Sequence, residues 1–117
     1  MTKSQWSSEH GAAVTALSQQ LTFARTELNK GNQPDIIASC NLLHDDLTAA
    51  MKAVPAPNPT VDAALRKAFG AISVGDSDCL EGARLASVAS ITERAMAELT
   101  TARTDMDSAN SAIAAWH

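Results

Sequence analysis

The sequence has few aromatic residues, no long apolar run and no excess of basic charge. Its 117 residues include two Phe, two Trp and no Tyr. No segment approaches the ~20 consecutive apolar residues that span a bilayer. Residues 1–8 carry one lysine and no apolar run, unlike a secretory signal. These absences predict a protein that neither spans a membrane nor is secreted, and we expect it in the cytoplasm.

The charge balance disfavours nucleic acids and membrane surfaces as partners. Nine Lys and Arg stand against 13 Asp and Glu, for a formal net charge of −4, and the two signs are interspersed. A nucleic-acid-binding face is basic because it must neutralise phosphates. The densest basic site, Arg66-Lys67, is typical of an ordinary helix surface. We therefore expect a protein partner or a homodimer.

Motifs that carry catalysis or bind phosphates are also missing. No G-x-S-x-G, P-loop or dinucleotide-binding pattern occurs. The adjacent carboxylates Asp45 and Asp46 point about 100° apart on a helix, so they do not converge on a substrate. Cys40 and His44 would lie on a bundle wall rather than beside an oxyanion hole. We expect no enzyme and no cofactor.

What the sequence has instead is alanine and helical periodicity. Alanine, the strongest helix former, occurs 23 times. Between Val88 and Trp116 no glycine or proline interrupts an apolar pattern with alternating spacings of three and four: Ala95, Leu99, Ala102, Met106, Ala109, Ile113 and Trp116. Such spacing puts one apolar stripe on an α-helix, which must be buried against other helices. We expect one all-α domain over residues 1–117.

Helix caps and breakers divide the first two thirds of the chain into three helices. They are a Thr2-x-x-Gln5 capping box, Gly31 after Lys30, Asn32 before Pro34, the proline-rich run 55–59 and Asn58 before Pro59. Thr and Asn side chains accept hydrogen bonds from the first amides of a helix. Glycine ends helices by adopting positive φ, and proline cannot continue one. We expect helices over 3–30 and 33–54, and a third from 59 onward.

The second half of the chain allows two arrangements. In one, Gly75 ends the third helix and a single long, bent helix follows. In the other, the third helix continues to Gly82 and a fourth starts near Ser87 or at the Ser90-x-x-Glu93 capping box. Matched helix lengths favour the second arrangement, an up-down-up-down four-helix bundle with short loops. In that arrangement Gly75 lets a neighbouring backbone approach.

Two cysteines, Cys40 and Cys79, fall on the apolar stripes of the second and third helices. At 1.5 Å per residue, the distances of the two cysteines from the proline-rich run along the helix axes differ by about 9 Å. Disulfide-bonded residues keep their Cα atoms within about 7 Å. We therefore favour two free buried thiols. The alternative is a disulfide, which needs an extended loop or an offset between the helices.

Cys40 and His44 also share a helical face, a spacing that can begin a zinc site. Cys79 and one nearby carboxylate would complete it: Asp45, Asp76 or Glu81. The second half of the chain lacks a paired ligand motif, so we expect no metal. A small-molecule or metal site in the core at Cys40, His44 and Cys79 is kept as an alternative function.

Trp6 and Trp116 have the largest apolar side chains and stand near the two ends of the sequence. In an up-down-up-down bundle both chain ends lie at the same end of the bundle. The two rings either pack against each other at the end of the core or form an exposed aromatic patch. A patch would bind a partner, because Trp is enriched at interface hot spots.

The order of motifs along the chain resembles small Ala-rich helical proteins of actinobacteria and their phages. These motifs are Cys40, His44-Asp45-Asp46, the run 55–59 and Cys79-Leu80-Glu81-Gly82-Ala83. The similarity covers residues 36–106. It implies a helical bundle with a paired-cysteine pattern, and it adds no active site.

These features predict a non-enzymatic bundle that acts by protein–protein contacts, such as a phage- or mobile-element-encoded modulator of a host protein. Homodimerisation through an Ala-rich face is its simplest form. Two alternatives stay open. One is the core site at the cysteines, and the other is a structural or assembly piece, a role that a disulfide would fit.

Overall fold

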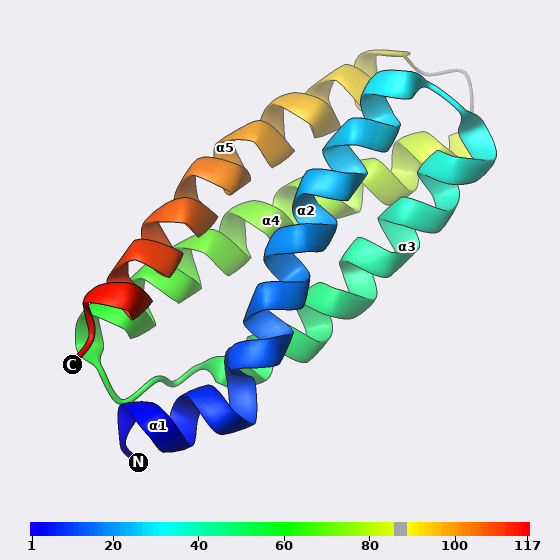
Figure 1. Cartoon of the computed structure of the whole chain (residues 1–117). Coiled ribbons are helices and arrows are strands. Elements are labelled where there is room, and N and C mark those ends of the chain that lie inside the picture. Colours follow the sequence, from blue (N-terminus) through cyan, green and yellow to red (C-terminus); the bar gives the residue numbers. More distant parts are fainter. Residues whose placement is uncertain (86–88) are drawn as a thin grey trace.

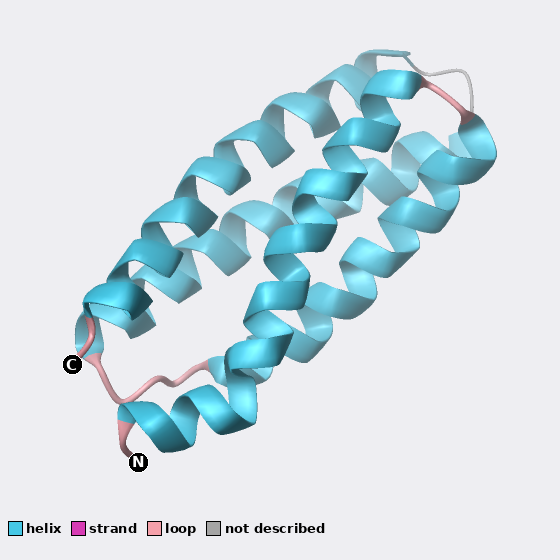
Figure 2. Ribbon diagram, viewed as in Figure 1, coloured by secondary structure: helices cyan, strands magenta, loops and turns pink. Residues whose placement is uncertain are grey.

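Four long helices form an up-down-up-down bundle in the computed structural model, which describes residues 1–85 and 89–117 (Figure 1). They are α2 (Ala12–Lys30), α3 (Gln33–Ala50), α4 (Pro59–Leu85) and α5 (Ala89–Ala115). A short α1 (Lys3–Trp6) precedes them, and the bundle measures 47 × 20 × 18 Å. Figure 2 shows a short loop between α2 and α3 and a longer one between α3 and α4. The expected all-α four-helix bundle is confirmed.

The expected helix caps are present. Gln5 N donates to Thr2 Oγ1 over 3.2 Å and Thr2 N donates to Gln5 Oε1 over 2.7 Å, which completes the capping box. Gly31 has a φ of 75°, the left-handed conformation that glycine adopts at little cost. Asn32 and Asn58 accept bonds from the first amides of α3 and α4. Local side-chain chemistry therefore sets these boundaries.

The N-terminal helix is bent, where the sequence predicts one continuous helix over 3–30. A π-helical turn over Ser7–Gly11 separates α1 from α2, and Figure 1 shows α1 turned away from the α2 axis at the end of the bundle. Such a turn interrupts the regular hydrogen-bond ladder and kinks a helix. Directly before this turn Trp6 is buried, and its ring donates from Nε1 to Ala53 O over 2.9 Å.

The second half of the chain follows the four-helix arrangement. α4 runs through Gly75 to Leu85, so a single long helix after Gly75 is wrong. The helix also continues past its expected end at Gly82. Among the described residues α5 begins at Ala89, which places Ser90 inside the helix rather than before it. The expected start near Ser87 lies outside the described residues.

Gly75 lies where α4 and α5 approach each other closely. A Cβ atom at this position would lie 2.5 Å from Leu99 Cδ2 and 3.3 Å from the Leu99 backbone nitrogen. Only a residue without a side chain fits this distance. The expectation that Gly75 permits a close backbone approach is confirmed.

The apolar stripes meet in one core. The stripe predicted near the C-terminus is buried in α5 at Ala95, Leu99, Ala102, Met106 and Ala109, whereas Ile113 is only partly buried. α2 buries a similar stripe, formed by Val14, Leu17, Leu21, Ala24 and Leu28. Burial of these stripes is the main source of stability in a bundle, because helix propensity alone is marginal. Within the described residues no helix combines the length and the apolar character needed to cross a membrane.

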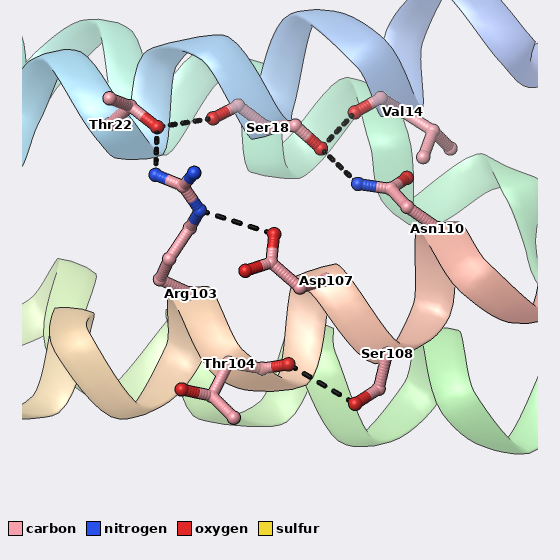
Figure 3. A network of polar contacts seen from close by, with 8 residues as sticks. All are labelled: Val14, Ser18, Thr22, Arg103, Thr104, Asp107, Ser108 and Asn110. Atoms are coloured by element: carbon pink, nitrogen blue, oxygen red, sulfur yellow. Dashed lines mark hydrogen bonds and ion pairs between the residues drawn. The ribbon is translucent and has the colours of Figure 1, made fainter.

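The contact between α2 and α5 is polar at its surface (Figure 3). Arg103 donates to Thr22 Oγ1 and, over 3.2 Å, to Asp107 Oδ1. Asn110 Nδ2 donates to Ser18 Oγ over 3.1 Å. The bundle therefore has a tightly packed α4–α5 side and a hydrogen-bonded α2–α5 side.

Candidate functional site

Cys40 of α3 and Cys79 of α4 form a disulfide, with their Cα atoms 5.7 Å apart. Both residues are buried, so the cross-link lies inside the α3–α4 contact. The prediction of free thiols is therefore wrong, and the alternative pairing is confirmed. The expected mismatch of Cys40 and Cys79 along the helix axes is absent, because residues 54–58 carry the chain past the end of α3 before α4 begins (Figure 1). This offset brings Cys79 level with Cys40.

One helical turn from the disulfide, His44 and Asp76 pair across the same α3–α4 contact. His44 Nδ1 lies 2.7 Å from Asp76 Oδ2, and the other carboxylate oxygen is buried with no hydrogen-bond partner in the described part of the structure. The hydrogen bond to Asp76 raises the pKa of His44 above its ordinary 6.5. Burial raises the pKa of Asp76 above its ordinary 3.8, and His44 opposes that rise. This pair can therefore bind and release a proton.

The residues considered for a metal or small-molecule site do not converge in the core. The sulfurs of Cys40 and Cys79 are bonded to each other, so neither is a thiolate ligand, and the His44 side chain is 54% exposed. Asp45 and Glu81 are exposed as well. Among the described residues, no group of three or more His, Cys, Asp or Glu side chains is placed to hold a metal ion. The arrangement is a buried cross-link beside a proton-binding pair.

Trp6 and Trp116 meet at the end of the core where both chain ends lie (Figure 1). Their ring centroids are 5.5 Å apart and the ring planes are tilted by 58°, a tilted contact of the kind that aromatic pairs prefer. Trp6 is 1% exposed and Trp116 is 9% exposed. The rings pack against each other, as one interpretation predicts, and do not form the exposed patch of the other.

A groove between α2 and α3 is a feature that the sequence analysis misses. This α2–α3 groove has a volume of about 260 Å³. It is lined by Phe23, Glu27 and Lys30 of α2 and by Asp35, Ala38, Ser39 and Leu42 of α3. Phe23 and Leu42, one from each helix, are each 49% exposed. Neither belongs to the buried apolar stripe of its helix, which is formed in α3 by Ile36, Cys40, Leu43 and Leu47. A position outside the stripe is the sequence signal for an outward-facing apolar side chain.

Two polar residues of the α2–α3 groove are buried. Gln20 Nε2 donates to Ser39 Oγ over 3.3 Å, so the polar group of Ser39 has a partner within the bundle. Glu27 is 5% exposed, and its Oε1 lies 3.6 Å from Lys30 Nζ. The Lys30 side chain is itself 64% exposed. The buried carboxyl group of Glu27 thus pairs with an exposed lysine.

A pair of acidic residues lies between α4 and α5. A hydrogen bond with Asp78, together with burial, raises the pKa of Glu98 to about 7. Arg94 Nε donates to Asp78 Oδ2 over 3.2 Å. The raised pKa of Glu98 makes this contact between α4 and α5 sensitive to pH near neutrality.

The fold and these sites define a disulfide-linked, all-α four-helix bundle. No protein-family model, curated protein or solved structure matches the chain. Its function must therefore be inferred from the geometry of its own residues.

Proposed function

We propose that this chain is a non-enzymatic helical bundle that binds another protein through the α2–α3 groove. The observation that carries this proposal is the pair Phe23 and Leu42, which line the groove from its two helices and are each 49% exposed. Large apolar side chains that face water across a shared hollow are unfavourable in a monomer. A partner that covers them removes their apolar surface from water, which is why exposed apolar patches mark binding sites.

The form of the groove supports a protein ligand. A partner helix can lay its apolar face into a groove between two helices. The groove has a volume of about 260 Å³ and is lined by both helices, so it can accept side chains of a partner helix. Val74 on α4 is 55% exposed but does not line the groove. A single exposed apolar residue needs no partner, and Val74 therefore serves as a matched control.

The α3–α4 contact supports a non-enzymatic function. His44 and Asp76 form a pair that could orient a general base. Nucleophilic catalysis also requires an activated nucleophile within hydrogen-bond reach of that base. The nearby cysteines are bonded to each other instead.

The disulfide bears on where the protein works. Structural disulfides persist in oxidising compartments and are rare in the cytosol. The Cys40–Cys79 cross-link therefore favours an oxidising compartment over the cytoplasm that the sequence predicts. Alkylation of thiols in intact cells, followed by mass spectrometry, tests this. A protein in an oxidising compartment would keep its cross-link, and a protein in the cytoplasm would be alkylated at both cysteines.

The test compares the wild type with the double variant Phe23→Ser/Leu42→Ser and with Val74→Ser. Light scattering over a range of concentrations detects a homodimer, and affinity capture detects a different partner. We expect the wild type and Val74→Ser to form the same complex and the double variant to lose it. Circular dichroism checks that all three proteins keep the bundle. A complex that survives in the double variant would contradict the proposal.

A structural or assembly piece is a second candidate, which the disulfide favours. A cross-link between α3 and α4 restricts the unfolded chain and stabilises the bundle, which suits a structural role. Assembly would appear in light scattering as higher-order species that persist in the groove double variant. That result would favour this candidate over the protein-binding groove.

A further inference from the structure

The acidic floor of the α2–α3 groove indicates what kind of protein segment it takes. We propose that the partner presents an amphipathic helix with an arginine or lysine between two apolar residues. Glu27 binds this cation, and Phe23 and Leu42 contact the apolar residues on either side. The inference rests on the proposed function and adds the chemistry of the partner to it.

Glu27 is the observation that points to a cation. Its side chain is 7% exposed although it lines a groove that is open to solvent. A buried carboxylate is unfavourable unless a positive group pairs with it. Lys30 Nζ lies 3.6 Å away on a side chain that is 64% exposed, and such exposed ion pairs are weak. A cation that arrives with a partner can therefore replace Lys30.

The other charges near the groove favour the same partner. Glu27 and Asp35 line the groove together with Lys30, so acidic groups outnumber basic ones there. The whole chain carries a formal net charge of −4. Opposite charge on a partner speeds the encounter and fixes the register of the complex. An acidic helix would instead meet Glu27 and Asp35 with like charge.

A displayed library of amphipathic helical peptides tests this proposal. One central position between two apolar residues is randomised, and peptides are selected against the wild type, Glu27→Gln, Phe23→Ser/Leu42→Ser and Val74→Ser. We expect arginine or lysine at the central position in peptides selected by the wild type and by Val74→Ser. We expect no such preference with Glu27→Gln, which keeps the shape of the side chain. Melting curves show whether each variant stays folded.

The outcomes separate this inference from the proposed function. The selected peptides could bind the wild type but not Phe23→Ser/Leu42→Ser, and carry no central basic residue. That result would overturn the proposal of a cationic partner and would leave the proposed protein-binding groove standing. If the wild type selects no peptide that requires these two residues, both proposals fail. If the wild type is a dimer that Phe23→Ser dissociates, a second copy of this chain fills the groove. That result would overturn the proposal that a helix of another protein binds there. That dimer would leave the proposed function standing.

The best arginine-containing peptide provides a quantitative check. Glu27→Gln should weaken its binding about tenfold, because a charge-assisted hydrogen bond is lost. The same peptide with norleucine in place of arginine should bind the wild type and Glu27→Gln equally. Lys30→Gln, an exposed substitution that removes the competing cation, should tighten binding of the arginine peptide. Equal affinity of the arginine peptide for the wild type and both variants would overturn the role of Glu27.

Discussion

Replacing Gly75 with alanine tests whether helix propensity or packing controls the α4–α5 contact. Alanine gains up to about 1 kcal/mol over glycine in a helix interior. The new Cβ would lie 2.5 Å from Leu99 Cδ2, 3.0 Å from Cγ and 3.3 Å from the backbone nitrogen. Leu99 is fully buried, so it has little room to turn away, and such overpacking costs about 1–3 kcal/mol. We expect a net loss of about 1 kcal/mol in unfolding free energy, or about 4 °C in Tm.

Gly70→Ala is the matched control for this substitution. Gly70 is exposed in the same helix, and a Cβ there would meet nothing within 4 Å. This variant should gain about 0.5–1 kcal/mol, so thermal melts of the two variants should shift in opposite directions. In a Leu99→Ala background Gly75→Ala should cost less, and a double-mutant cycle measures the coupling. A higher Tm for Gly75→Ala than for the wild type would refute the close-approach argument.

Three further predictions concern the cross-link and the titrating pairs. Reducing the disulfide, or replacing both of its cysteines with alanine, should lower the unfolding free energy by about 4 kcal/mol, the loop-closure entropy for a separation of 39 residues. Urea denaturation measures this loss, and equal midpoints with and without reductant would contradict it. NMR titration should place the pKa of His44 above 6.5 in the wild type and closer to 6.5 in Asp76→Asn. Because folding raises this pKa, its contribution to stability is complete below pH 6.5 and is lost as the pH rises through the folded value. The stability advantage of the wild type over His44→Gln should shrink accordingly, and a constant difference would argue against the pair. The pKa of Glu98 should be about 7, and Asp78→Asn should lower it toward 4.5. Since a raised carboxyl pKa makes stability fall as the pH rises from 4.5 through about 7, that variant should show a shallower fall, and an unchanged slope would exclude the coupling.

Features set by neighbouring residues could be predicted from the sequence, whereas features set by the connections could not. Thr2 and Asn58 act on amides within three residues of them, so their patterns leave few alternatives. The height of Cys79 relative to Cys40 depends on the direction of residues 54–58. Proline content predicts that this run is not helical, but it does not predict how far the run carries the chain along the bundle.

The same distinction holds for the candidate sites. His44 and Asp76 are 32 residues apart, and their contact needs the helix offset that also forms the disulfide. The sequence singles out both residues as candidate ligands but does not predict that they pair. Phe23 and Leu42 are harder to recognise, because single exposed apolar residues are common on protein surfaces. Their meaning depends on lining the same groove, which only the packing of α2 on α3 establishes.

The disulfide also determines how the chain would respond to a pulling force. Tension applied at the two termini would pass through the sulfur–sulfur bond and would not load the residues between Cys40 and Cys79. With a sequence separation of 39, the stretched oxidised chain would be shorter than the reduced one by about 130 Å, at roughly 3.4 Å per residue. Both termini lie at the same end of the bundle (Figure 1), so the pull would first separate Trp6 from Trp116 and then peel α2 from α5. The C-terminal half of α3 and the larger part of α4 are thereby shielded from mechanical load.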